Sequence, residues 1–256
     1  MRGFVSATRE VWASYDLPVE EDPEGTVHIA FDESFEPLTC VGATVADTEY
    51  TRLNDSISTL YAELTSYSWL DDLKSFKKFA KDGFHASGDP DEVSTRFIHF
   101  LAQSSGYSTS IFFSEERTRH KNRVAVLLYR DLIRTLLQKY ARRPLIHLYF
   151  EQNDELDPYF QSIVASAMKD VRRPKPEVSV QVHSKMDPPL SAICDYTMLT
   201  FARWYAGGYR GSQPQAQDPR VSTWRNFNAL RNSISVVRSL ESGTLTRRAL
   251  PFEALI

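Results

Sequence analysis

Three acidic residues directly follow or interrupt apolar segments of the chain. A carboxylate at such a position needs an explanation from the folded structure, because its neighbours in the sequence do not provide one. Asp32 follows the apolar run 27–31, and Glu151 follows the apolar run 144–150. Asp195 lies among apolar residues over 193–199, where a carboxylate without a cation or hydrogen-bond donors is costly to bury. These contexts make the three acids candidate members of one site.

A cluster of such carboxylates suits a hard divalent cation. Neighbouring carboxylates repel, so each raises the pKa of the next until a cation neutralises them. Mg²⁺ takes one or two carboxylates together with waters and phosphate oxygens, and Mn²⁺ accepts the same ligands. Two such ions about 3.5–4 Å apart can activate a water and stabilise a leaving oxygen. The predicted chemistry is therefore Mg²⁺- or Mn²⁺-dependent hydrolysis of a phosphodiester.

Each strand-end acid also has an ordinary interpretation. Asp32, Glu33 and Ser34 could form a hairpin turn, and Glu151 could be a solvated loop acid. Asp195 fits neither, because its helix is apolar on most sides. The occurrence of all three acids together favours a functional site over these ordinary interpretations.

The surrounding elements predict how these acids meet. Apolar runs over 27–32, 38–46, 107–113, 144–150 and 177–183 predict strands, and helical spacing appears over 48–66, from 89 to 101, and over 122–140, 157–171 and 189–205. Strands separated by helices imply right-handed parallel crossovers. This order predicts an α/β RNase H-like fold, a mixed five-stranded sheet flanked by helices with a helical insertion between strands 2 and 3.

The predicted topology brings the acids together. Ligands of an open α/β sheet bind beyond the carboxyl ends of its strands. In the RNase H-like order the first and fourth strands are parallel neighbours, so Asp32 and Glu151 should emerge side by side. Asp195 lies near the start of the last helix, which faces the same edge.

Outside this core, residues 1–25 form a lead-in, 26–206 the RNase H-like domain, and 207–256 a C-terminal extension. Six apolar residues at helical spacing predict that the extension is helical and packs on the domain: Trp224, Phe227, Leu230, Ile234, Val237 and Leu240. The extension is a candidate surface for a homo-oligomer or a protein partner.

The composition is that of an ordinary globular protein. Net charge is −3, and the chain has two cysteines, Cys40 and Cys194, both in apolar sequence that predicts reduced core residues. No segment has the length and apolarity of a membrane span or a secretory signal, which predicts a cytoplasmic location without membrane contact. Residues 203–256 carry eight arginines against three acids, which permits a polyanionic partner.

Four short motifs resemble a bacterial family called domain of unknown function 3800. Residues 31–34 resemble its opening Asp-Glu-Ser motif, and 84–97 resemble its His-Ala segment and following helix. Residues 148–154 resemble its acid-ended fourth strand, and 192–196 its closing helix motif. The resemblance spans about residues 27–206 and departs at Phe35, where the family has glycine, and at Ala192, where it has glutamine.

The resemblance implies an RNase H-like, metal-dependent nuclease acting on DNA or RNA. It implies Asp32, Glu151 and Asp195 as metal ligands and Glu33 as a candidate fourth. His85, in the polar His-Ala segment, is a candidate proton carrier or phosphate donor, with a loop or capping role as the alternative. The departures at Phe35 and Ala192 leave open the alternative that the protein is a catalytically degenerate RNase H-like module with a nucleic-acid-binding or regulatory role.

The sequence lacks the motifs of other common types of catalytic or binding site. No zinc pattern, nucleophile elbow or glycine-rich phosphate loop occurs. Basic clusters at 117–123 and 172–175 are interpreted as solvated helix ends, with phosphate contacts as the alternative. His28, His99, His147 and His183 are interpreted as packing residues, as are Trp224 and Phe227.

Overall fold

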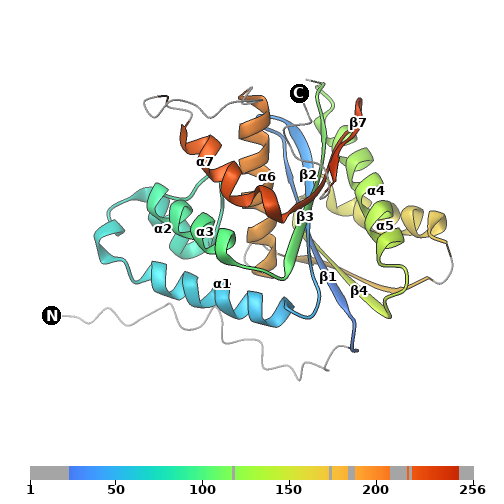
Figure 1. Ribbon diagram of the computed structural model, residues 1–256, viewed down its shortest axis with the longest axis horizontal. Coiled ribbons are helices and arrows are strands. Elements are labelled where there is room, and N and C mark those ends of the chain that lie inside the picture. Colours follow the sequence, from blue (N-terminus) through green and yellow to red (C-terminus); the bar gives the residue numbers. More distant parts are fainter. Residues whose placement is uncertain are drawn as a thin grey trace.

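A computed structural model describes residues 23–116, 119–172, 175–183, 188–207, 218 and 221–247. One mixed sheet of seven strands runs through this part of the chain in the order β5-β4-β1-β2-β3-β6-β7 (Figure 1). The strands are β1 Val27–Ser34, β2 Thr39–Ala46, β3 Tyr107–Ser114, β4 Leu145–Glu151, β5 Glu177–His183, β6 Ile234–Ser239 and β7 Gly243–Arg247.

The first five strands have the predicted order and directions. β2 is antiparallel to both β1 and β3, whereas β4 is parallel to both β1 and β5. This arrangement is the RNase H-like sheet, and the predicted fold class is confirmed. The two additional strands lie beyond β3, with β6 parallel to β3 and β7 antiparallel to β6.

Helices cover both faces of the sheet. They are α1 Tyr50–Thr65, η1 Ser68–Leu70, α2 Lys74–Asp82, α3 Asp91–Gln103, α4 Lys121–Lys139, α5 Asp157–Asp170, α6 Leu190–Ala206, α7 Val221–Leu230 and η2 Arg231–Ser233. The segment from α1 to α3 is the predicted helical insertion between β2 and β3. None of the described helices is long and apolar enough to cross a membrane.

Two apolar cores explain how the layers hold together. On one face α4 and α5 bury residues such as Leu132 and Phe160 against Phe31 and Phe150 of the sheet. On the other face α1, α3 and α6 pack around Phe97, with α6 crossing β1 and β2 (Figure 1). The side chains of β1 alternate between these cores, because successive residues of a strand point to opposite faces.

The prediction of a helical extension over 207–256 is wrong for residues 234–247, which contain two strands, and residues 248–256 lie outside the described residues. Helix α7 carries Phe227 and Leu230 as expected, but Ile234 and Val237 lie in β6, and Leu240 follows that strand. A register shift in the ladder with β3 leaves Ser235 as an extra residue in β6, so Ile234 and Val237 both reach the same core and their spacing of three resembles that of a helix. Residues 1–22 of the predicted lead-in lie outside the described residues.

Candidate active site

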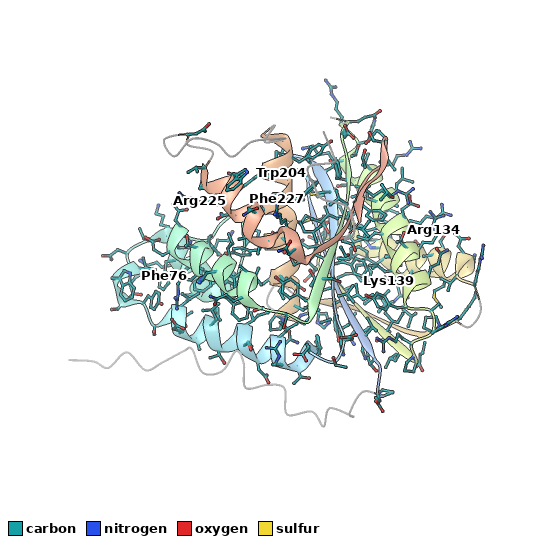
Figure 2. The ribbon with its side chains drawn as sticks, viewed as in Figure 1. Phe76, Arg134, Lys139, Trp204, Arg225 and Phe227 are labelled. Carbon is teal, nitrogen blue, oxygen red and sulfur yellow. The ribbon has the colours of Figure 1, made fainter. Side chains whose placement is uncertain are left out.

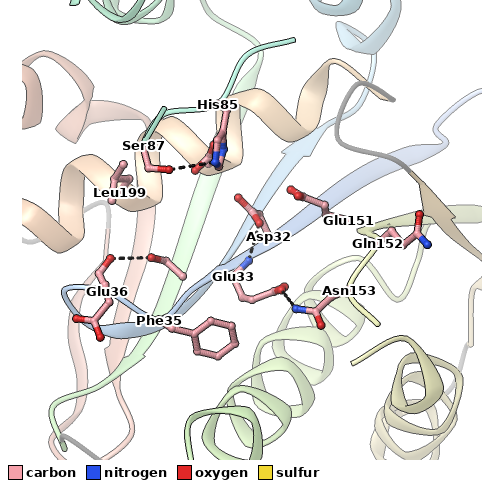
Figure 3. A pocket seen from close by; sticks show the side chains of 12 residues that line it. Asp32, Glu33, Phe35, Glu36, His85, Ser87, Glu151, Gln152, Asn153 and Leu199 are labelled. Atoms are coloured by element: carbon pink, nitrogen blue, oxygen red, sulfur yellow. Dashed lines mark hydrogen bonds and ion pairs between the residues drawn. The ribbon is translucent and has the colours of Figure 1, made fainter. Parts of the chain in front are cut away.

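Asp32 and Glu151 lie side by side on neighbouring parallel strands. The register of β1 and β4 pairs Phe31 with Phe150, so the next residues along the two strands are Asp32 and Glu151. Adjacent strands are about 4.8 Å apart where they pair, as at Phe31 and Phe150, one residue before the two acids. Both acids point to the α6 face, because Ala30 and Tyr149, two residues earlier, pack in the core on that face. Figure 3 shows the two carboxylates next to each other.

Asp32 does not end its strand, contrary to prediction. β1 continues to Ser34, but its ladder with β4 stops at Phe31 while its ladder with β2 goes on. Asp32 therefore lies where the two strands separate. Its side chain is only 6% exposed, and its Oδ1 accepts a hydrogen bond from the backbone N–H of Glu33 at 2.8 Å.

Asp195 reaches the same region from α6 and is held by the loop before α3. Its Oδ2 accepts hydrogen bonds from Nδ1 of His85 at 3.0 Å and from the backbone N–H of Ala86 at 2.8 Å. The other ring nitrogen of His85, Nε2, lies 3.0 Å from the hydroxyl of Ser87. His85 thus links a carboxylate to a hydroxyl at the pocket wall (Figure 3).

A second carboxylate, Asp89, fastens this loop to α6. Its Oδ2 accepts hydrogen bonds from the backbone N–H of His85 at 2.8 Å and from the hydroxyl of Tyr196 at 2.5 Å. Burial raises the pKa of Asp89 to about 6. The loop and the helix position Asp195 and His85 as one unit.

Glu33 points to the opposite face of the sheet from Asp32. Its Oε1 accepts a hydrogen bond from Nδ2 of Asn153 at 2.6 Å, and its Oε2 accepts one from the hydroxyl of Tyr129 on α4. Burial raises the pKa of Tyr129, and the negative charge of Glu33 raises it further. Glu33 therefore joins the strand end to α4 and to the loop after β4.

All five predicted site residues line one pocket of about 480 Å³: Asp32, Glu33, His85, Glu151 and Asp195. Glu36, Gln152 and Asn153 add further polar lining, and no lysine or arginine is among the described lining residues, although Lys121 pairs with Glu36 from outside the lining. The pocket is therefore strongly negative. Within the described ranges, however, no three His, Cys, Asp or Glu side chains are close enough to hold a metal ion as they stand.

The two cysteines lie beneath this pocket and are not reactive. Both are free and buried, as predicted. Burial raises the pKa of each thiol, and the charge of Asp32 raises it further. Both thiols stay protonated at neutral pH, so neither supplies a nucleophile.

Outside the pocket, two of the predicted packing residues are buried, and one residue of the first basic cluster forms an ion pair. Phe227 is buried and stacks on Trp204 at 3.9 Å between α7 and α6, which confirms it as a packing residue (Figure 2). His28 is buried and stacks on Tyr50 at 3.5 Å. In the first basic cluster, Lys121 pairs with Glu36. Arg117 and Arg173 lie outside the described residues.

Sequence reasoning missed the residues that hold the acids in place. Tyr129 donates to Glu33 from 96 positions away, and Asp89 joins its near neighbour His85 to Tyr196, which lies 107 positions further along the chain. Asn153 had a usable signal, because it lies two residues after Glu151 and thus at the same strand end.

Comparisons with known proteins add little. No protein-family model and no curated protein matches the sequence. Among solved structures, a chain in the structure of the PCNA:RNase HII complex from Archaeoglobus fulgidus is similar over 80% of this chain and 88% of that chain, with a TM-score of 0.36 and 13% identity. The chemistry of the site has to be inferred from its own side chains.

Proposed function

We propose that this protein is a divalent-metal-dependent nuclease that hydrolyses phosphodiester bonds in the acidic pocket. The observation that carries the proposal is the placement of Asp32 and Glu151 on adjacent parallel strands, with Asp195 reaching the same pocket from α6. The described lining gathers five acidic side chains; Glu36 pairs with Lys121, and the charge of the other four favours a cation.

The donors present fit magnesium or manganese in kind. Carboxylate oxygens are the ligands these ions prefer, and Mg²⁺ needs only one or two of them beside waters and substrate phosphate. Asp32 and Glu151 supply such a pair, whereas Asp195 is already engaged by His85 and Ala86. When bound, the ion would stabilise charge on the phosphate and lower the pKa of the attacking water.

The protein's own side chains supply the remaining catalytic roles. Buried Asp32 is a fixed anchor, and half-buried Glu151 beside it reaches the pocket from β4. Asp195 orients the His85 ring through Nδ1, so that Nε2 faces Ser87 and the pocket. A histidine backed by a carboxylate can accept a proton and hold the resulting charge, which suits His85 to carry protons during water attack.

The test is cleavage of labelled single- and double-stranded DNA and RNA with Mg²⁺ or Mn²⁺. Asp32→Asn and Glu151→Gln should each reduce the rate by more than about a hundredfold, because ligand loss exceeds the 10–100-fold cost of altering an outer contact. Glu36→Gln is the matched control, since Glu36 lines the same pocket but is exposed and paired with Lys121. Cleavage that survives both ligand variants would refute the proposal.

One observation favours a second candidate, a module that binds nucleic acid without cleaving it. The carboxylates share a pocket but, among the described residues, do not surround a common point. Metal-independent binding with no turnover on any of these substrates would support this candidate over the nuclease.

A further inference from the structure

Helix α2 displays four lysines along one side. Lys74, Lys77, Lys78 and Lys81 occupy positions i, i+3, i+4 and i+7, which lie on one face of a helix, and all four are exposed. The opposite face buries Phe76 and Phe79 in the core of the insertion, and Figure 2 labels Phe76 there. We call these four residues the lysine stripe.

The lysine stripe is poorly neutralised by the protein itself. Within the described residues its one ion pair joins Lys81 to Asp82 at 3.9 Å, and both side chains of that pair have substantial exposure. Asp71 and Asp72 precede the helix and are exposed, but neither forms an ion pair with the stripe among those residues. Several positive charges are therefore available to an external anion.

The stripe borders the acidic pocket. The ammonium group of Lys78 lies 3.9 Å from the position that a β-carbon on Gly88 would occupy, and Cδ2 of His85 lies 3.2 Å from the same point. Since His85 and Ser87 line the pocket, Lys78 stands just outside its wall.

An exposed aromatic residue precedes the N-terminus of α2 in the chain. Trp69 in η1 is 70% exposed and stacks on Tyr67 with ring centroids 4.3 Å apart. Stacked aromatic rings beside a basic groove are the means by which proteins hold single-stranded nucleic acid without sequence preference.

We propose that the lysine stripe, with Trp69, binds the phosphodiester backbone of a single-stranded nucleic acid and leads it into the acidic pocket. This proposal rests on the proposed function and adds the path of the substrate. An acidic pocket repels a polyanion, so the cations that attract the strand have to lie beside it. From Lys74 to Lys81 the helix rises about 10 Å, so the four ammonium groups are spread out along the helix and can contact more than one phosphate of a bound strand.

Binding is measured with the full chain in EDTA, which separates it from cleavage, using a fluorescein-labelled 20-nucleotide single-stranded DNA and RNA. Lys77→Gln/Lys78→Gln should weaken binding about tenfold or more at 0.1 M salt. The slope of log K against log salt should fall by about 1.4, at about 0.7 for each phosphate that a lysine no longer neutralises. Lys139→Gln/Lys169→Gln, with the same charge change on exposed residues of α4 and α5, should leave both unchanged.

A further variant tests the aromatic part. Trp69→Ala should weaken binding by about tenfold, whereas Trp69→Phe should restore most of it, because base stacking on an aromatic ring accounts for about 1–3 kcal/mol. The melting temperature of each variant establishes that the exposed substitutions leave the fold intact.

Equal binding and equal salt slopes for the stripe and control variants would overturn the inference, even if metal-dependent cleavage is observed. Stripe-dependent binding without any cleavage would uphold it and refute the nuclease proposal. Vesicles with 30% phosphatidylserine form the last arm. Stripe-dependent binding to vesicles but not to nucleic acid would overturn the assignment in favour of a membrane surface.

Discussion

At the scale of single residues, the site depends on a small network around Asp195. His85 and Ala86 donate to its Oδ2, and Asp89 holds His85 and Tyr196 in turn. Asp89 is the unusual member, because burial places its pKa at about 6 against an ordinary 3.8. Its charge state changes in the pH range where the protein would be assayed.

The pH dependence of stability tests this assignment. A carboxyl whose folded pKa is raised stabilises the folded state below its unfolded pKa and loses that contribution as pH rises through the folded value. Between pH 4 and 7 the wild type should therefore lose about 2–3 kcal/mol relative to Asp89→Asn, since one pKa unit corresponds to 1.36 kcal/mol. Urea unfolding of both proteins across this range measures the difference.

Asp89→Asn is a close match, because its amide oxygen can still accept from Tyr196 and from the His85 N–H. Parallel curves for the two proteins from pH 4 to 7 would show that Asp89 titrates normally.

At the scale of elements, the site depends on how closely α6 approaches the sheet. Gly42 of β2 pairs with Asp32, and a β-carbon there would lie 2.8 Å from Sγ of Cys194. The neighbouring residue on α6 is Asp195. The absence of a side chain at Gly42 therefore allows α6 to carry its carboxylate down to the level of Asp32.

Gly42→Ala should destabilise the protein by about 1–3 kcal/mol, the usual cost of overpacking a core. Cys194→Ala on the same background should recover most of this loss, because it removes the atom that the new methyl group meets. Thermal unfolding of the two single variants and the double variant forms the cycle. Additive losses would show that the close approach does not limit the packing of α6.

The elements were predictable from sequence to different degrees. β1 to β5 and the helices between them follow apolar runs of ordinary period. α2 escaped notice because only Phe76 and Phe79 mark its buried side, although their spacing of three, opposite four lysines, was a helical signal. The apolar spacing in β6 predicts a helix because the register shift at Ser235 disturbs the alternation of a strand.

At the scale of the whole molecule, β6 and β7 extend the sheet to seven strands and cover the edge of β3. Val237 is fully buried in the core beneath α6 and α7, whereas Val236 faces the α4 side and is only partly buried. β6 and β7 are therefore part of the main sheet.

Val237→Ala should cost about 1–3 kcal/mol of unfolding free energy, and Val236→Ala should cost clearly less, because less apolar surface is lost from water. Urea unfolding of the two variants compares them directly. The reverse order would mean that β6 presents its other face to the core.

The placement of the candidate site could be predicted because strand order alone brings Asp32 next to Glu151. The engagement of Asp195 by His85, and of Glu33 by Tyr129, could not, since these contacts depend on side chains brought from distant elements. Because such contacts cannot be inferred from sequence, the sequence predicts that the three carboxylates form one ligand set. In the structure the described carboxylates share a pocket but do not surround a common point.

If Asp32 and Glu151 bind a divalent cation together, as proposed, anomalous scattering from a Mn²⁺-soaked crystal will locate the ion. We expect a manganese peak within coordination distance of both carboxylates, absent in Asp32→Asn. A pocket without manganese at millimolar concentration, or a peak bound only by residues elsewhere, would contradict the proposal.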